Sequence, residues 1–262
     1  MCKIISVCNQ KGGIGKTNLT LNLGIGIANT GKKVLLIDSD PQGSLTNNLG
    51  FMAVELTNTL STIYNKLIDP DFDEDVIPDD YILHSEEGVD LIPSNITLSE
   101  SEFDLPRAEL REYKLKNFIS TIKDRYDYIF IDCPPSLGLL SVNALSASDE
   151  VLVPLTATKE CLDMLYPFSK TFKRTRKILN PSLKINGFVF NLYQDNTNLT
   201  KEMTLKFKEE LGADSKFYSP IPSSNPLREC ADRGISIFKY KPRSKAQKAF
   251  DAYTKLVEEV LA

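Results

Sequence analysis

Short, continuously apolar runs alternate along the chain with longer stretches in which apolar residues recur at helical spacing. The apolar runs predict strands at residues 4–8, 33–38, 89–93, 126–132, 150–154 and 185–191. They lack the regular alternation of a half-exposed strand, which is typical of strands buried on both faces of a parallel sheet. The stretches between them predict helices at residues 17–29, 60–67, 107–124, 160–179, 199–211 and 244–261.

Strands and helices alternate throughout, with no linker or internal repeat between them. This order predicts the α/β class: a doubly wound, mostly parallel sheet with helices on both faces. We therefore expect a single domain over residues 1–262. In the helix predicted at residues 107–124, one buried face is expected from Leu110, Leu115, Phe118, Ile119 and Ile122.

A glycine-rich segment joins the first predicted strand to the first predicted helix. It reads K-G-G-I-G-K-T over residues 11–17. Glycines let backbone N–H groups turn toward an anion, and the start of a helix adds the positive end of its dipole. In such a phosphate-binding loop, Lys16 reaches the β- and γ-phosphates and the Thr17 hydroxyl ligates Mg²⁺. The strand before and the helix after disfavour a chance Gly/Lys-rich turn.

The loop departs from the ordinary G-x-x-x-x-G-K-[ST] pattern in two ways. Gln10 stands where that pattern has glycine, and a second lysine, Lys11, stands near the start of the loop. This is the deviant Walker A signature, and here the chain resembles the ParA/Soj/MinD family of P-loop ATPases. The resemblance implies an ATP-dependent homodimer in which Lys11 reaches across the interface to the partner's nucleotide.

Two aspartate motifs follow at the ends of predicted strands, where ligands collect in open α/β sheets. The segment D-S-D-P-Q-G-S, residues 38–44, is similar to the family's D-x-D-P-Q-G-[NS]. There the second aspartate, Asp40 here, positions or activates the attacking water. In the alternative interpretation, Asp40 only caps a turn before Pro41. Asp132 in D-C-P-P-S ends an apolar run as in a Walker B motif, where it holds Mg²⁺ through a water or hydrogen-bonds Thr17.

The resemblance covers essentially the whole chain and implies Mg²⁺-dependent hydrolysis of ATP to ADP and phosphate, slow without a partner. The implied catalytic residues are Lys11, Lys16 and Asp40. Asn18 stands where the family has a second threonine, and its amide can still donate to an α-phosphate oxygen. The expected metal set is Thr17, Asp38 and Asp132, and the expected nucleotide-binding set is Lys11, Gly12, Gly13, Ile14, Gly15, Lys16, Thr17, Asn18, Asp132, Asn191 and Pro222.

Basic residues gather near the C-terminal end, although the formal net charge of the chain is −4. The family binds DNA without sequence preference as ATP dimers, but its usual arginines are replaced by Asn196 and Ser223. Phosphate contacts need positive groups on one face and not one unique residue. The hypothesis is therefore DNA contact through Lys201, Arg228, Arg233, Lys239, Lys241, Arg243 and Lys245. Ordinary solvated surface is the alternative.

The resemblance further implies plasmid or chromosome partition with a ParB-like centromere-binding protein that stimulates hydrolysis. We expect a cytoplasmic, nucleoid-associated protein without an N-terminal helix-turn-helix extension, signal peptide or membrane segment. The five cysteines form no C-x-x-C pair, which favours buried thiols over a metal site.

Three points stay open on the residues alone. A MinD-like positioning ATPase would bind membrane through a basic C-terminal helix, and Glu258 and Glu259 disfavour it. A small-molecule ligase on the same scaffold is a further alternative. The acidic stretch 69–90 is either solvated surface or a face for a basic partner segment.

Overall fold

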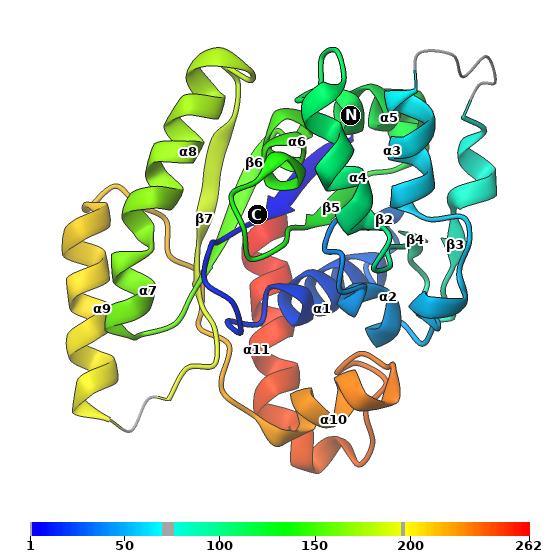
Figure 1. Ribbon diagram of the computed structural model, residues 1–262. Coiled ribbons are helices and arrows are strands. Elements are labelled where there is room, and N and C mark those ends of the chain that lie inside the picture. Colours follow the sequence, from blue (N-terminus) through cyan, green and yellow to red (C-terminus); the bar gives the residue numbers. More distant parts are fainter. Residues whose placement is uncertain (1, 70–75, 195–196) are drawn as a thin grey trace.

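The computed structural model describes residues 2–69, 76–194 and 197–262. In this part of the chain, a seven-stranded sheet runs in the order β3-β4-β2-β5-β1-β6-β7 (Figure 1). Every neighbouring pair is parallel except β3 and β4. The predicted α/β class is confirmed. The strands are β1 (Lys3–Val7), β2 (Val34–Asp38), β3 (Leu83–His84), β4 (Asp90–Ile92), β5 (Tyr128–Asp132), β6 (Glu150–Leu155) and β7 (Lys184–Phe190).

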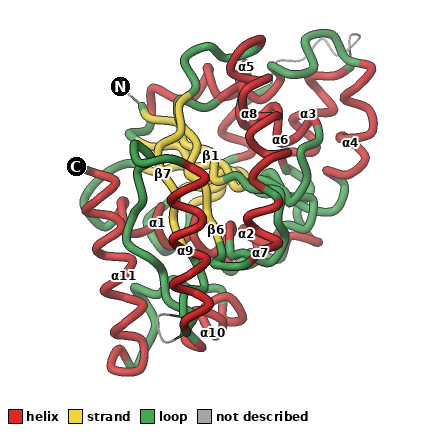
Figure 2. Tube along the Cα trace, turned by 90° about the vertical axis from the view of Figure 1, so that its left-hand side faces the viewer, coloured by secondary structure: helices red, strands yellow, loops and turns green. Residues whose placement is uncertain are grey.

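Helices cover both faces of the sheet, and Figure 2 shows it between α11 on one side and α6 and α8 on the other. One face is covered by α1 (Lys16–Ala28), α2 (Ser44–Asn48), α10 (Asn225–Arg233) and α11 (Arg243–Leu261). The other face is covered by α3 (Leu60–Ile68), α4 (Leu98–Asp104), α5 (Lys114–Ile122), α6 (Leu139–Ala147), α7 (Lys159–Asp163), α8 (Leu165–Ile178) and α9 (Asn198–Leu211).

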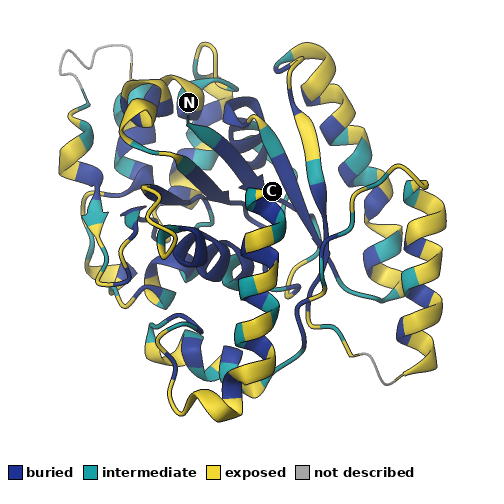
Figure 3. Ribbon diagram, turned by 180° about the vertical axis from the view of Figure 1, so that it is seen from behind, coloured by how far each residue is buried: buried dark blue, intermediate teal, exposed yellow. Residues whose placement is uncertain are grey.

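The central strands are buried on both faces, as their uninterrupted apolar runs predict. In β2, Leu35 and Ile37 join one apolar cluster, whereas Val34 and Leu36 join the cluster on the opposite face. Figure 3 shows these strands as buried, while outer helices such as α9 and α11 keep one exposed face and α1 is buried along nearly its whole length. Successive side chains of a strand point to opposite sides, so an unbroken apolar run is required when both sides are covered.

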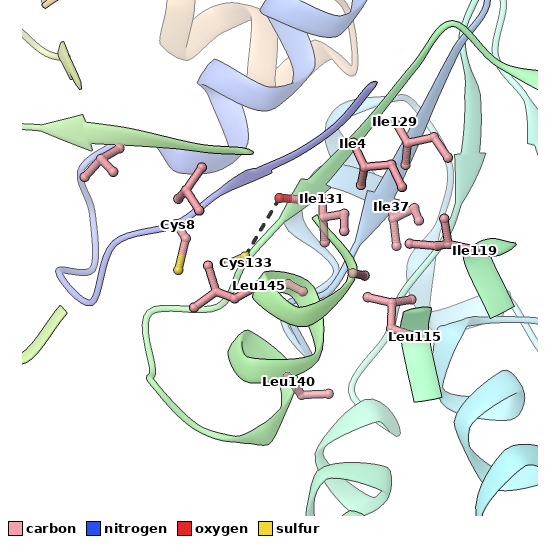
Figure 4. Close-up of a cluster of buried hydrophobic side chains, with 14 of the residues drawn as sticks. Ile4, Cys8, Ile37, Leu115, Ile119, Ile129, Ile131, Cys133, Leu140 and Leu145 are labelled. Carbon is pink, nitrogen blue, oxygen red and sulfur yellow. Dashed lines mark hydrogen bonds between the residues drawn. The ribbon is translucent and has the colours of Figure 1, made fainter. Parts of the chain in front are cut away.

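Buried thiols belong to the apolar core beside the sheet. Figure 4 shows Cys8 and Cys133 among isoleucine and leucine side chains, with the Cys133 Sγ 3.9 Å from the carbonyl oxygen of Ile131. The cysteines are free; Cys2 is half-buried and the others are buried. The expectation of buried thiols is thereby met.

Two predicted helices are wrong as single elements. The region predicted as one helix over residues 107–124 holds only α5, between the 3₁₀ turns Leu105–Arg107 and Lys123–Arg125. Leu110, expected on the buried face, has a φ of 49° and is 67% exposed. Asn143 of α6 stabilises the break, because its side chain accepts from the Leu115 N–H and donates to the Arg111 carbonyl. Residues 160–179 divide into α7 and α8, since Pro167 lacks the N–H that a continuous helix needs and fits only a first turn.

Among the helices and strands of the described residues, β3, α2, α4 and α10 have no counterpart among the predictions. The short β3 lies within the acidic stretch, whose residues 70–75 are outside the described residues. Its neighbour Glu87 accepts from the Ser236 N–H and hydroxyl at 3.0 and 2.9 Å. The helix α10 buries only Leu227 and Cys230, a pattern too short to predict a helix.

Candidate active site

Three strands deliver polar residues to one edge of the sheet. In the parallel register, Asp132 of β5 lies opposite both Val7 of β1 and Asp38 of β2. The glycine-rich loop that follows β1 is thus set beside the two aspartates. Next to them lies a cleft of about 470 Å³, which is ample for a nucleotide. Its lining includes Gly12, Gly13, Gly15, Lys16, Thr17, Asn18, Asp40 and Asn191.

The glycine-rich loop is held in its shape by Asn191, which follows β7. The Asn191 Nδ2 donates to the carbonyls of Ile14 and Gly15 at 3.0 and 3.1 Å. Gly15 has a φ of 77°, and a Cβ there would lie 2.6 Å from that nitrogen. Gly15 also precedes α1, whose first turn receives no side-chain cap. The N–H groups of this turn therefore suit an anion in the cleft.

The two lysines of the loop occupy different surroundings. Lys16 is buried as a residue, and its ammonium donates to the Lys11 carbonyl at 3.2 Å. The Lys11 ammonium donates to the Thr158 hydroxyl at 2.8 Å and lies 3.5 Å from a carboxylate oxygen of Glu160. Lys16 thus lines the cleft and contacts the loop backbone, whereas Lys11 contacts the start of α7 in its own chain.

Asp38 is fully buried and is committed to hydrogen bonds. Its Oδ1 accepts from the Asp40 N–H at 3.2 Å, and its Oδ2 accepts from the Thr46 N–H and hydroxyl at 2.9 and 2.8 Å. Burial raises the pKa of Asp38 to about 6, and the bonds from Thr46 oppose this rise. Asp38 therefore organises the turn that carries Asp40. Thr46 was not among the predicted residues, since no strand-end or loop signal marks it.

Asp132 is buried and keeps one oxygen unpaired. Its Oδ1 accepts from the Thr20 hydroxyl at 3.3 Å, whereas its Oδ2 has no hydrogen-bond partner among the described residues. Burial raises the pKa of Asp132 to about 8, helped by the charge of Asp38 and opposed by the Thr17 hydroxyl and by Lys16. Thr20, one helical turn after Thr17, was not predicted, although the i, i+3 spacing places both on one helix face.

These residues fit a magnesium ion that is bound together with phosphates. An unpaired carboxylate oxygen beside a threonine hydroxyl is a hard oxygen site of the kind that Mg²⁺ prefers. Within residues 2–69, 76–194 and 197–262, no group of three or more His, Cys, Asp or Glu side chains could hold a metal. Mg²⁺ in protein sites commonly uses one or two side chains plus phosphate oxygens and water, so Thr17 and Asp132 suffice.

Asp40 lines the cleft and also caps a turn. Its Oδ1 accepts from the Gln42 N–H at 3.0 Å, and its carbonyl accepts from the Ser94 hydroxyl at 2.9 Å. Its half-buried carboxylate is nevertheless one of the groups that line the cleft. Both interpretations of Asp40, as a turn cap and as a group facing the substrate, are therefore compatible with its geometry.

The cleft is closed on one side by α10. The Asn18 Nδ2 donates to the Leu227 carbonyl at 3.2 Å, and the Asn18 Oδ1 accepts from the Tyr253 hydroxyl at 3.0 Å. The Asn18 amide thus ties α1 to α10 and α11, while Asn18 also lines the cleft as its predicted contact with an α-phosphate oxygen requires. Pro222 is buried and pairs with Tyr193; it does not itself line the cleft, although the nearby Leu192 and Ser224 do.

The basic residues expected to contact DNA are divided among several roles. Arg228 lines the cleft. Arg233 pairs with Glu229 at 3.2 Å, Lys239 donates to the Glu86 carbonyl at 3.0 Å, and the Arg243 guanidinium lies 4.1 Å from the Phe250 ring centroid. Lys241 and Lys245 are exposed near the start of α11, and Lys201 is exposed on α9. Asn196 lies outside the described residues, and Ser223 donates its N–H to the Tyr193 carbonyl.

Comparison with known proteins identifies the family. A family model described as "AAA domain" matches residues 2–185. The sporulation initiation inhibitor protein Soj of Bacillus subtilis is 39% identical over 262 residues, covering 100% of this chain and 99% of Soj. The chain belongs to the ParA/Soj family of partitioning ATPases. The chromosome partitioning protein ParA of Caulobacter vibrioides is 34% identical, over 99% of this chain and 94% of ParA.

A solved structure of similar fold contains nucleotide. The cobyrinic acid a,c-diamide synthase of Mycobacterium smegmatis, with bound ADP and magnesium, superposes with a TM-score of 0.84. It is 29% identical, and the match covers 100% of this chain and 94% of the synthase. This ParA/Soj chain therefore has the P-loop ATPase fold. Homologous structures with this fold have been solved with bound ADP or an ATP analogue and magnesium.

Burial of the Asp132 carboxyl should make the folding stability of the chain depend on pH. The pKa of Asp132 is about 8 in the folded chain and about 3.9 in the unfolded chain. Between these two pH values the folded state holds a proton that the unfolded state has lost, so the free energy of unfolding falls as the pH rises. We expect Asp132→Asn to raise the melting temperature by about 3–6 °C near pH 8.5 and by less near pH 6. Thermal melts without nucleotide check this, with exposed Asp124→Asn as control. An equal gain at both pH values would contradict the charge-burial explanation.

Proposed function

We propose that this chain is a partition ATPase that binds Mg-ATP, dimerises on ATP and binds DNA without sequence preference in the dimeric state. The observation that carries the proposal is the buried Asp132 carboxylate, which is influenced by Thr17 and Lys16 and keeps one oxygen without a hydrogen-bond partner among the described residues, next to a cleft lined by Lys16, Thr17 and Asp40. That set combines a phosphate cradle, a magnesium site and a candidate for handling water. The full-length likeness to Soj and to ParA supports the partition role.

Each residue has a distinct part in the proposed reaction. Lys16 and the first-turn N–H groups of α1 bind the phosphates. Thr17 and Asp132 would hold Mg²⁺, which neutralises charge on the phosphates, while Asp38 keeps the Asp40 turn in place. Asp40 orients the attacking water and accepts its proton. Lys11 of the partner subunit adds positive charge at the phosphates, so the site is complete only in the dimer.

The rest of the proposal concerns partners and place. We propose a ParB-like protein as the stimulator of hydrolysis, and a cytoplasmic location on the nucleoid. The structure within the described ranges contains no helix long and apolar enough to cross a membrane. The C-terminal helix also disfavours a MinD-like membrane mode: Leu256, Val257 and Val260 are buried, and Glu259 accepts from the Ser219 N–H and hydroxyl at 2.8 and 2.6 Å.

A small-molecule ligase is the second candidate, and one observation favours it: the likeness to a cobyrinic acid a,c-diamide synthase. The sequence relatives favour partition, since Soj matches at 39% identity over its full length against 29% for the synthase. ATP turnover that rises on addition of random-sequence DNA and a ParB-like protein supports partition. Turnover that ignores both supports the ligase.

Filter retention of random-sequence DNA tests the proposed DNA binding. We expect retention with Mg-ATP at low salt and none without nucleotide. The double variant Lys241→Glu with Lys245→Glu should weaken retention at every sequence and reduce the slope of log affinity against log salt by about 2. The charge-matched control is Lys116→Glu with Lys123→Glu, which changes exposed residues around α5 on the other face of the sheet. Wild-type protein that retains no DNA with ATP would sink the proposal.

A further inference from the structure

Arg228 has a position that sets it apart from the other basic residues near the C-terminal end. Of the described residues that line the cleft beside the glycine-rich loop, only Lys16 and Arg228 carry a positive charge. The Arg228 side chain is exposed, and its guanidinium makes no hydrogen bond or ion pair within the described residues. Arg233, Lys239 and Arg243, by contrast, are all engaged within the chain.

The position of Arg228 is fixed by contacts at both ends of α10. At the start of the helix, the neighbouring Leu227 carbonyl accepts from the Asn18 amide at 3.2 Å. At the end, a Cβ on Gly234 would lie 2.8 Å from the Gly50 Cα, so the backbone after α10 packs directly on the segment after α2. The helix is therefore held against both α1 and α2, and Arg228 is presented to the cleft by fixed backbone.

The hydrogen bonds that hold α10 continue from Asn18 into the interior of α1. The Asn22 Nδ2 donates to the Asn18 Oδ1 at 2.8 Å, and the Asn22 Oδ1 accepts from the Ile237 N–H at 2.8 Å. The Tyr253 hydroxyl completes the set on Asn18 at 3.0 Å. Asn18 belongs to the first turn of α1, whose N–H groups suit phosphate. Arg228 is thus placed on the Asn18 side of the phosphate cradle.

The chemistry of a guanidinium decides which ligand fits there. Its five N–H donors form a rigid fork that matches phosphate oxygens, and the Arg228 fork has no hydrogen-bond partner within the described residues. We propose that Arg228 is a nucleotide-binding residue that contacts a phosphate common to ADP and ATP. This proposal rests on the proposed function, because it requires the cleft to take a nucleotide. It removes Arg228 from the residues expected to contact DNA.

A contact with a shared phosphate predicts a specific pattern of affinities. Loss of the guanidinium in Arg228→Ala lowers the affinity for Mg-ADP and for Mg-ATP by the same factor, about 10- to 100-fold. Arg228→Lys keeps the charge but not the fork, so it recovers only part of the loss. The ratio of ATP to ADP affinity stays unchanged in both variants, because the γ-phosphate is not involved.

Titration calorimetry of the full chain with Mg-ADP and with Mg-ATP tests the proposal. The matched control is Arg107→Ala, which removes an exposed guanidinium that does not line the cleft and leaves both affinities unchanged. Melting curves without nucleotide verify that the variants are folded, and Arg228→Lys serves if the alanine variant is not. Equal losses for both nucleotides support the assignment.

Three results would overturn it. Unchanged affinities in Arg228→Ala show that the guanidinium does not touch the nucleotide, and a loss of DNA retention alone returns Arg228 to the DNA surface. A loss confined to ATP places the contact on the γ-phosphate. Wild-type protein that binds neither nucleotide defeats the proposed function itself, which distinguishes that failure from a failure of the Arg228 assignment.

Discussion

Replacing Asp40 by alanine is expected to lower ATP turnover by about 10²- to 10⁴-fold while ATP binding and ATP-dependent dimerisation persist. The phosphate cradle is built from Lys16 and the first turn of α1, and neither depends on the Asp40 side chain. The backbone of residue 40 is held by Asp38 and by the Ser94 hydroxyl through its N–H and carbonyl, which the substitution keeps. Phosphate release under single-turnover conditions measures the chemical step.

Asp40→Asn separates the two interpretations of this residue. The asparagine keeps an oxygen that accepts from the Gln42 N–H, so it preserves the turn cap, but it cannot take a proton at neutral pH. If Asp40 handles water, both variants lose turnover to a similar extent. Normal turnover in Asp40→Asn would identify Asp40 as a cap only, and normal turnover in both variants would remove it from the mechanism.

The sequence predicts the site best where the candidate residues lie in the glycine-rich loop or directly at the ends of strands. The loop of residues 11–17, Asp38 and Asp132 could be placed because parallel strands end at one edge of the sheet, and the register of β1, β2 and β5 confirms their proximity. The glycine-rich pattern also predicts a backbone turn at Gly15, and the structure agrees, since its positive φ and the close Asn191 amide exclude a side chain there. Local spacing and strand ends are sufficient for these features.

The missed features depend on contacts between distant segments. Asn143 of α6 stabilises the break in the helix predicted at residues 107–124, and no local pattern shows that interaction. Thr46 supports Asp38 across a turn, and Asn18 turns toward α10 because Leu227 and Tyr253 offer partners. The place of α10 beside the cleft likewise follows from packing on α1 and α2. Arg228 therefore resembled a surface charge until tertiary structure placed it.

Replacing Lys11 by alanine is expected to weaken the ATP-dependent dimer by at least about 10²-fold. In the proposed dimer, the Lys11 ammonium is buried against the partner's phosphates, so its removal leaves charge uncompensated at the interface. Nucleotide binding by one subunit should change by less than about threefold, because Lys16 donates to the Lys11 backbone carbonyl and not to its side chain. Sedimentation velocity with Mg-ATP, in the Asp40→Ala background, measures the dimer, with exposed Lys32→Ala as control.

The resting contact of Lys11 within its own chain sharpens this prediction. Glu160 is 73% exposed on the side chain and lies 3.5 Å from the Lys11 ammonium, so solvent screens this ion pair and it is weak. A phosphate group at a desolvated interface attracts the same ammonium more strongly. Glu160→Gln should therefore tighten the ATP dimer by about two- to fivefold, the reverse of Lys11→Ala. A dimer unaffected by Lys11→Ala would remove Lys11 from the interface, whereas an equal loss of nucleotide binding would show that it acts within its own subunit.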